Sequence, residues 1–552
     1  MRLPLTRLFS EASSRDRSRS HSPSPATGHT STSDISAGSP AINPASSRIA
    51  AEFATLAPPR SHQGASDNGR PLPILDWAAQ ILTAARTTMG GLGQQRRPLR
   101  VHSGFSGMMS HAQVLRALGV DFADLVGAEP KEHANRFCIL NGLAPQHLFR
   151  DVRTVINREE AHCVSCQRTC APPVDVPDLF IAGFSCQPYS PMRGRHMSQV
   201  PPHEHDKFDG LLLTAAYLLE WLPSAAVLEN TAGFARQVNF AGLAPGAVTT
   251  QADAAAAEPS ATDDSATMSG LKWLQEKLSP HFHVGWVVLN SSAWVAMRRP
   301  RLWIFVVRSD LGPKSLVDEA CRVASDLQSH RLQSPPARIS DIASPSGSQE
   351  EADILWSFSL AAELTARDAV PRLRDASGKR PAWLRESDAQ RAAWRAEGRS
   401  NHDAHPLATA RLRGLSGTDR QREVLELHLM RACYAHGLDP ASPSDAIEAS
   451  RELTADISQN LSWISPSATM SCLTRESIVY AYDLDRILAP SEILGLHGWH
   501  RPSVDGISAR QVRDMAGEAQ SLQCLAAAVM GLLLAIAPAT PSLWAPSSSP
   551  SA

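Results

Sequence analysis

The sequence has little that would mark a membrane, disulfide-rich or strongly basic protein. Its most apolar run, Cys524–Pro538, is shorter than the roughly 20 residues that a membrane-spanning helix needs, so we expect a buried helix there and no membrane partner. Only nine cysteines are scattered over 552 residues, which does not make a disulfide framework and favours a reducing compartment. Because the formal net charge is −2, any nucleic-acid binding must come from a local patch.

Large apolar residues are scarce at both ends of the chain. Residues 1–72 are mostly Ser, Pro, Thr, Gly and Arg, and such a segment cannot bury enough surface to offset its chain entropy. We therefore predict a disordered N-terminal tail, and a second disordered tail over 541–552. The expected location is the nucleus. Because the Arg- and Ser-rich start is also compatible with a transit peptide, an organelle is the alternative.

Two low-complexity segments interrupt the middle of the chain. Gly242–Gly270 is rich in Ala, Thr and Asp without periodicity and is predicted to be a surface loop. Residues 331–353 are rich in Ser and Pro, which is typical of a linker. This linker separates a predicted domain over 73–330 from a region over 354–470.

Short apolar runs alternate with helical patterns between Leu99 and Arg308. The strand-like runs are PLRVHSGFSG, DLVGAEP, DLFIAGFSC, AAVLEN and RLWIFVV. The helix-like segments are SHAQVLRALG, KEHANRFCILNG, LLLTAAYLLEWL and GLKWLQEKL. This alternation predicts βαβ units and an α/β fold with a Rossmann-like, doubly wound, mostly parallel sheet. In such sheets ligands bind beyond the carboxyl ends of the strands.

Polar residues follow several of these predicted strands. A small, Gly-rich turn follows the first strand at Ser103, Gly104, Ser106 and Gly107. Such a turn lets backbone N–H groups approach a ligand, although a plain tight turn has the same composition. Glu129 follows the second strand, where it could accept hydrogen bonds from a ribose or be a solvated acid. Asp151 follows the third strand region and could bind an adenine amino group.

A thiol and a carboxyl group follow the next two strands. In DLFIAGFSCQPYS, an apolar strand is followed by a turn that carries Cys186, a position where the thiol does not pack as core. In AAVLEN, Glu229 comes directly after apolar residues, and a carboxyl group in such surroundings is a candidate for a raised pKa and for acid catalysis.

Taken in order, these motifs resemble those of the cytosine-C5 DNA methyltransferases. DLFIAGFSCQPYS resembles the nucleophile motif of that family, VLENTAGF its Glu-Asn-Val motif, and MRRPRLWIFVV its Gln-x-Arg-x-Arg motif. Near the end of the chain, RILAPSEILGLHGW and MAGEAQSLQCLAAAVMGLLL resemble the segments that close the small domain and return to the cofactor pocket. The resemblance thus implies a catalytic domain over 73–330, a target-recognition region over 354–470, and a returning segment over 471–540.

The resemblance implies a covalent mechanism. C5 of cytosine is a poor nucleophile, so a thiolate first adds to C6, and Cys186 would be this nucleophile because a thiolate is both a strong nucleophile and a good leaving group. Glu229 would protonate or hydrogen-bond N3. Arg301, together with Arg299, would hold the cytosine O2 and a nearby phosphate. Because the ring is attacked from above its plane, the base must leave the stack.

The resemblance also implies a cofactor and a partner. S-adenosylmethionine would donate the methyl group, and cytosine-containing DNA would be the partner. The residues expected to bind the cofactor are His102, Ser103, Gly104, Phe105, Ser106, Gly107, Glu129, Pro130, Asp151 and Gly183. Two alternatives remain: a catalytically silent homologue that binds DNA or cofactor as a scaffold, and an enzyme that methylates structured RNA.

Several positions depart from the family pattern. The substituted residues are His102 for Phe, Ser185 for Pro, Thr231 for Val, Met297 for Gln and Glu518 for Asn. Since proline fixes φ, Ser185 is expected to leave the Cys186 loop more mobile. The carboxylate of Glu518 is expected to weaken cofactor binding.

Two further segments allow more than one interpretation. Residues 367–399 carry nine Lys or Arg against five acidic residues, with Trp383 and Trp394 among them; this is compatible with phosphate contacts and base stacking or with a solvated helix. In HCVSCQRTC, the soft ligands His162, Cys163, Cys166 and Cys170 could hold zinc. Because the spacing is compressed and lies on a loop, we assign no metal ligand.

Overall fold

The structure is a computed structural model, and its described residues belong to one compact unit that comprises Ala65–Phe240 and Ala261–Ala552. The structure describes residues 76–89, 92–190, 205, 207–236, 238–239, 267–332, 335–343, 381–410, 419–451, 453–458, 469–470 and 472–545. The predicted tail over 1–72, most of the predicted loop at Gly242–Gly270 and part of the predicted linker lie outside these residues.

A seven-stranded sheet forms the centre of the unit, in the order β10-β11-β7-β6-β1-β2-β3. The strands are β1 (Leu99–Gly104), β2 (Phe122–Ala128), β3 (His147–Phe149), β6 (Leu179–Ala182), β7 (Ala225–Asn230), β10 (Phe282–Asn290) and β11 (Pro300–Arg308). The first five pair in parallel, and β11 is antiparallel to both β7 and β10. The predicted fold class, a Rossmann-like and mostly parallel doubly wound sheet, is thereby confirmed.

Some strands of the sheet are easier to predict from the sequence than others. All residues of β6 and β7 are buried, which explains their continuous apolar runs. Within this sheet, β10 is the strand that we did not predict, and it lies at the edge. Its exposed and buried residues are mixed, with Trp286 and Val288 exposed by 45% and 39% although both belong to the apolar run Trp286–Leu289.

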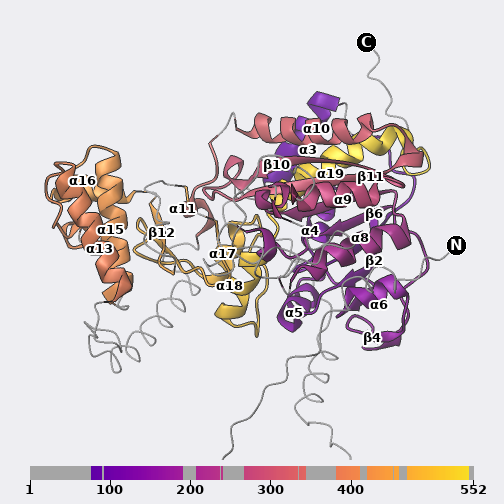
Figure 1. Cartoon of the computed structure of the whole chain (residues 1–552), viewed down its shortest axis with the longest axis horizontal. Helices are drawn as coiled ribbons and strands as arrows, with labels where there is room; N and C mark the ends of the chain where they lie inside the picture. Colours follow the sequence, from indigo (N-terminus) through magenta and orange to yellow (C-terminus); the bar gives the residue numbers. More distant parts are fainter. Residues whose placement is uncertain are drawn as a thin grey trace, which may run out of the picture. The chain divides into compact units, whose positions relative to one another are not determined.

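Helices cover both faces of the sheet (Figure 1). On one side, α3 (Asp76–Met89), α4 (Ser110–Ala117), α10 (Ser315–Arg331) and α19 (Leu522–Ile536) contact one another. On the other side, α8 (Asp209–Trp221) contacts α6 (Val152–Asn157) and α9 (Gly270–Leu278). The ring of Tyr217 in α8 stacks on Phe180 of β6 with centroids 3.9 Å apart. The helices α5 (Glu132–Leu140), α17 (Pro490–Gly495) and α18 (Ala509–Glu518) lie in the same unit.

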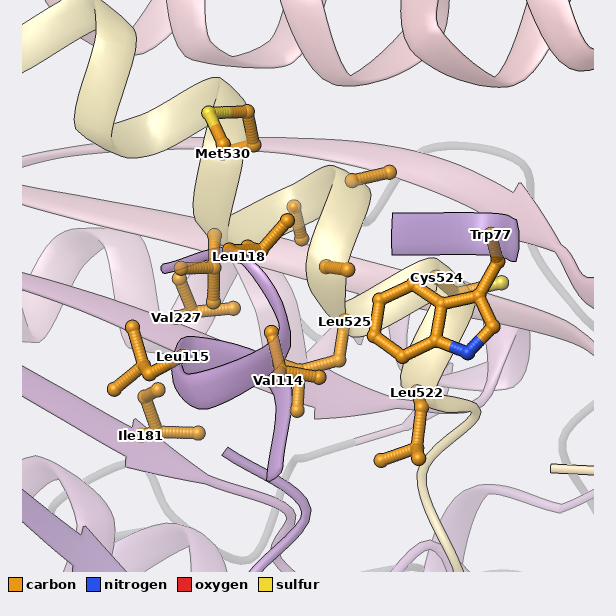
Figure 2. Close-up of a cluster of buried hydrophobic side chains, with 14 of the residues drawn as sticks. Trp77, Val114, Leu115, Leu118, Ile181, Val227, Leu522, Cys524, Leu525 and Met530 are labelled. Atoms are coloured by element: carbon orange, nitrogen blue, oxygen red, sulfur yellow. The ribbon is translucent and has the colours of Figure 1, made fainter. Parts of the chain in front are cut away.

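The core of the unit is built around α19, which comes from the far end of the sequence. Figure 2 shows its residues Leu522, Cys524, Leu525 and Met530 beside side chains of α4 and the sheet. Every residue of α19 is buried. Burial of leucine-sized side chains contributes about 1.5–3 kcal/mol each, so a segment more than 200 positions after β11 stabilises the sheet.

The helical stretch Ala509–Ala539 is long and apolar enough to cross a membrane by length and composition. However, 83% of its most apolar window is buried inside the protein. It is therefore packed as a core helix is packed, as the sequence predicts for Cys524–Pro538.

A second hydrophobic cluster lies in the later part of the chain. Its elements are α13 (Ala382–Ala396), α14 (Pro406–Thr409), α15 (Asp419–Ala435), α16 (Pro443–Ser450), β12 (Thr454–Asp456), β13 (Val479–Ala481) and β14 (Arg486–Ile487). Trp394 is only 5% exposed and packs edge-on against Tyr434. Its ring is therefore part of this core and has no exposed face on which a base could stack.

Two predicted boundaries differ from the structure. The strand β12 pairs with β13, and β13 pairs with β14, so one small sheet spans the predicted division at 470/471. At the C-terminus, Leu543 and Trp544 are buried, and Ala545 N donates to Gln94 O at 2.8 Å. The predicted disordered tail over 541–552 is thus wrong for its first five residues; the rest of it lies outside the described residues.

The shorter elements complete the fold. They are α11 (Ile339–Ile342), the hairpin of β4 (Ala161–Cys163) and β5 (Arg168–Cys170), and the pair β8 (Val238–Asn239) and β9 (Thr267–Met268).

The substitution Leu525→Ala tests the contribution of α19. Leu525 is fully buried, so truncation leaves a cavity and should lower the free energy of unfolding by about 2–5 kcal/mol, measured by urea denaturation with circular dichroism. As a control, Leu332→Ala removes a side chain that is 60% exposed and should change stability by less than about 0.5 kcal/mol. Equal effects of the two substitutions would contradict the central place of α19.

Candidate functional site

An open cavity lies at the carboxyl ends of β1, β2 and β6, with about 520 Å³ of empty space when the adjoining open solvent is included. Its walls come from the loop after β1, from Glu129 and Lys131 after β2, from the end of β6, and from a C-terminal segment. Its position is where a doubly wound sheet binds ligands. The C-terminal wall consists of Met515, Glu518, Ala519 and Gln520.

The loop between β1 and α4 has an unusual backbone. Phe105, Gly107 and Met109 all have left-handed conformations, with φ of 52°, 51° and 55°. A Cβ atom at Gly107 would meet nothing within 4 Å, so a side chain would fit there. Glycine is favoured because it adopts a positive φ without strain. In this conformation Gly107 N points at Glu129 and donates to Oε2 at 2.8 Å.

Glu129 is held as a buried acceptor in the cavity wall. It is 5% exposed, and its Oε1 accepts from Lys131 N at 2.9 Å. Burial raises the pKa of this carboxyl group, and the backbone N–H groups of Lys131 and Gly107 oppose the shift. Since an ionised carboxylate has about four acceptor positions, Glu129 can accept further hydrogen bonds from a ligand hydroxyl.

Six of the ten residues predicted to bind the cofactor line the cavity: Gly104, Phe105, Ser106, Gly107, Glu129 and Gly183. Of the others, Ser103 is buried and Pro130 follows Glu129 without lining the cavity. His102 is fully buried, its Nδ1 lies 2.6 Å from Tyr217 Oη, and burial lowers its pKa to about 3. Asp151 is exposed and caps α6 by accepting from Arg153 N at 2.9 Å.

Gln520 lines the cavity and was not predicted from the sequence. Its Nε2 is buried without a hydrogen-bond partner among the described residues. This atom would lie 3.0 Å from a Cβ at Gly183, which is also part of the wall. An unsatisfied buried amide is costly, so Gln520 is suited to donate to a bound ligand. His111, another cavity residue, is instead paired with Asp124 Oδ2 at 3.0 Å.

The carboxylate of Glu518 shares two cations with Asp514. It pairs with Lys131, and its Oε1 lies 3.3 Å from Arg475, while Asp514 pairs with the same two side chains. The expected weakening of cofactor binding by Glu518 stays a prediction.

Cys186 begins the short 3₁₀ turn Gln187–Tyr189 directly beyond β6, and its side chain is half-buried. Burial raises the pKa of the thiol, the guanidinium groups of Arg301 and Arg299 lower it, and Glu229 raises it. These charges act on the thiol from β7 and β11, so the structure brings together all four residues that were predicted to be catalytic.

Glu229 and Arg301 form an ion pair at the ends of β7 and β11. Arg301 Nε lies 3.0 Å from Glu229 Oε1, and the side chains are 12% and 9% exposed. Burial raises the pKa of Glu229, while Arg301 and Arg299 oppose the shift. Glu229 Oε2 would lie 3.4 Å from a Cβ at Gly183, so this carboxyl group adjoins the cavity wall.

The residues after Glu229 hold the Cys186 loop in place. Asn230 Nδ2 donates to Phe184 O at 3.2 Å, and Asn230 Oδ1 accepts from Thr231 N at 2.8 Å. A Cβ at Gly233 would lie only 2.0 Å from Tyr189 O, so only glycine permits this close approach. The VLENTAGF motif therefore positions the nucleophile loop as well as supplying the carboxyl group.

Arg299 is a positioning residue within this group. It is 2% exposed, and its two terminal nitrogens have four partners. These partners are Cys472 Sγ at 3.2 Å, Leu473 O at 3.1 Å, Gly517 O at 3.0 Å and Ala519 O at 2.7 Å. The guanidinium therefore fixes the C-terminal segment against the end of β11, and the resemblance alone did not indicate this function.

A second thiol, that of Cys472, lies beside the two arginines. Arg301 Nη2 also donates to Cys472 Sγ, at 3.4 Å. Burial opposes ionisation, but Arg299 and Arg301 outweigh it and lower the pKa of this thiol. No motif marks Cys472, because its partners are more than 170 positions away.

The cysteines of HCVSCQRTC gather around a different histidine from the one predicted. The ligand atoms of His147, Cys163, Cys166 and Cys170 all lie within 4.8 Å of one another. His162 is exposed on β4 and does not belong to this group. His147 could not be found from the local spacing because it lies on β3, 16 positions before Cys163.

Comparison with known proteins gives no match to a protein-family model or to a curated protein. Among similar solved structures is the Entamoeba histolytica methyltransferase EhMeth, with 12% identity, a TM-score of 0.39, and coverage of 79% of this chain and 98% of that one. Another is the S. pombe Dnmt2 methyltransferase, with 11% identity, a TM-score of 0.37 and the same coverages. At these scores the functional argument rests on the residues of this chain.

The pKa values of the two thiols of the site are shifted in opposite directions, so the thiols should become reactive at different pH. We expect iodoacetamide to modify Cys472 at lower pH than Cys186, because the pKa of Cys472 is lowered and that of Cys186 is raised. Mass spectrometry of the two peptides across a pH series measures this order. In urea-unfolded protein, where the arginines no longer act on them, both thiols should react alike; a native order in which Cys186 reacts first would refute the assigned electrostatics.

Proposed function

We propose that this protein is an S-adenosylmethionine-dependent DNA (cytosine-5-)-methyltransferase. The observation that carries the proposal is the convergence of a thiol, a buried carboxyl group and a guanidinium beside a strand-end cavity. Glu229 and Arg301 are 3.0 Å apart, and both act on the Cys186 thiol. A silent scaffold would need none of these groups, so their presence together supports catalysis.

Cys186 is proposed to add to C6 of the cytosine. The thiolate is the reactive form, and the guanidinium of Arg301 favours it by opposing the effect of burial. Sγ forms a bond to C6, and the electron pair of the C5–C6 double bond becomes available at C5. After C5 has been methylated, loss of its proton restores the double bond and releases the thiolate of Cys186.

Glu229 is proposed to act on N3 of the same ring. Because burial raises its pKa, the carboxyl group holds a proton to higher pH than an exposed one and can share it with N3. This withdraws electrons from the ring as Cys186 attacks. Arg301, paired with Glu229 Oε1, keeps the carboxyl group aimed and is placed to bind the cytosine O2.

The cavity fits the proposed cofactor by its chemistry. Glu129 has acceptor positions left for ribose hydroxyl groups, and Gln520 Nε2 is a buried donor without a partner among the described residues. S-adenosylmethionine would supply an electrophilic methyl group there. Gly183, which lines the cavity and adjoins Glu229, connects the proposed cofactor site to the cysteine and carboxyl group.

Covalent trapping tests the chemistry and the substrate together. With S-adenosylmethionine present, a 5-fluorocytosine-containing DNA duplex should form a stable adduct with the wild-type protein, because fluorine at C5 blocks the final elimination. Cys186→Ala should form none, whereas Cys321→Ser, a change in the distant helix α10, should trap as wild type. The adduct is measured as a slower band in a denaturing gel.

The same experiment with 5-fluorocytosine in structured RNA separates the alternatives. Adducts with DNA alone support the proposal. Adducts with RNA alone would show that the substrate is RNA and that the proposed DNA substrate is wrong. If neither nucleic acid is trapped while the protein binds S-adenosylmethionine, the protein is a silent homologue and the proposed activity is wrong.

Cofactor binding is tested by Glu129→Ala. Loss of a charged acceptor should weaken S-adenosylmethionine binding by about 1–3 kcal/mol, measured by isothermal titration calorimetry. The matched control is Asp151→Ala, which removes an exposed carboxylate outside the cavity wall and should bind as wild type. If Asp151→Ala weakens binding and Glu129→Ala does not, the cofactor does not occupy this cavity.

A further inference from the structure

We propose that His147, Cys163, Cys166 and Cys170 form a structural zinc site at the edge of the central sheet. Their ligand atoms lie within 4.8 Å of one another, although β3 supplies the histidine and the β4–β5 hairpin supplies the cysteines. The site is separate from Cys186 and Glu229, and its role does not depend on the proposed function.

The geometry around His147 Nδ1 is difficult to explain by hydrogen bonding alone. This nitrogen lies 3.3 Å from Cys170 Sγ, 3.6 Å from Cys166 Sγ and 4.0 Å from Cys163 Sγ. A neutral imidazole nitrogen has one lone pair and accepts one hydrogen bond. Three sulfur atoms around one nitrogen therefore cannot all donate to it, whereas a cation at their centre would bind all four ligands at once.

The distances agree with a tetrahedral zinc centre. Zinc bonds of about 2.3 Å to sulfur and about 2.0–2.1 Å to nitrogen place a sulfur and a nitrogen ligand about 3.5 Å apart. The three measured separations of 3.3, 3.6 and 4.0 Å lie around this value. Three thiolates and one imidazole are a donor set that structural zinc sites use, and the set leaves no position open for a substrate.

The backbone around the cysteines is arranged as a ligand turn. Cys166 N points at Cys163 Sγ at 3.4 Å, and an N–H group aimed at sulfur favours the thiolate that a metal requires. Gln167 adopts a left-handed conformation with φ of 54°, and its N–H donates to Cys163 O at 2.8 Å. Cys163 is fully buried, and the other two cysteines are partly buried.

The zinc would close the exposed edge of the sheet. β3 is the last strand in the order, and edge strands present unpaired backbone groups to solvent. Only one backbone hydrogen bond is found here between the hairpin and β3 among the described residues, from Val164 N to Leu148 O at 2.7 Å. A metal shared by the hairpin and His147 would fix the hairpin over this edge.

Metal content of the full-length protein tests the site. We expect about one zinc per chain by inductively coupled plasma mass spectrometry after desalting into metal-free buffer. His147→Ala and the double variant C166S/C170S should lose it. The matched control is His162→Ala, which removes the exposed histidine of the same hairpin and should retain the metal.

A rescue variant separates ligation from folding. His147→Cys supplies a fourth thiolate and should retain zinc, although His147→Ala does not. Cobalt(II) bound in place of zinc should give the intense visible absorption of tetrahedral cobalt thiolates in the wild type and His147→Cys. Wild-type protein that is folded by circular dichroism yet carries no stoichiometric zinc and takes up none would overturn the proposal. Equal zinc in C166S/C170S, or a disulfide among these cysteines in protein purified under reducing conditions, would also overturn it.

Discussion

The rest of the site depends on the hydrogen bonds of the buried Arg299 guanidinium group. A charge removed from water must be compensated by hydrogen bonds, and here the compensation comes from groups more than 170 positions away, at Cys472, Gly517 and Ala519 among others. Two of these positions flank residues of the cavity wall, so satisfying one cation also places Gln520 beside the ligand space. Arg299 therefore links the C-terminal wall of the cavity to the segment that carries Cys472 and Leu473.

The sequence could predict the parts of the molecule that local patterns encode. Alternating apolar runs and helices predicted the parallel sheet, and polar residues after successive strands indicated Cys186 and Glu229, because parallel strands end at one edge. Arg301 was predicted only from the resemblance of MRRPRLWIFVV to a family motif. The edge strand β10 was missed because its apolar run Trp286–Leu289 is short and follows Gly285, and glycine is depleted in strands. Trp394 could be interpreted as a base-stacking ring until burial placed it in a core, since composition does not reveal which face of a helix is covered.

Contacts between segments that are distant in the sequence could not be predicted. Cys472, Gln520 and His147 carry no local signal: the fold alone brings Cys472 beside Arg299, Gln520 beside Gly183 and His147 beside the three cysteines. For the cysteine cluster, adjacency in sequence even indicated the wrong histidine, because side chains alternate along β4 and His162 points away from the sulfurs. Successive side chains of a strand point to opposite faces. Rules that use only the spacing between cysteines and histidines do not take this into account.

The late position of α19 in the sequence bears on how the protein is synthesised. The strands and helices up to β11 leave the ribosome more than 200 residues before the helix that fills the core beside Val114 and Leu115 (Figure 2). Domains usually fold as units during translation, and incomplete ones expose apolar surface to aggregation. Until α19 emerges, the nascent sheet therefore leaves part of its hydrophobic face uncovered, and exposed apolar surface of this kind favours aggregation. The wall of the cavity is correspondingly complete only after Gln520 has been made.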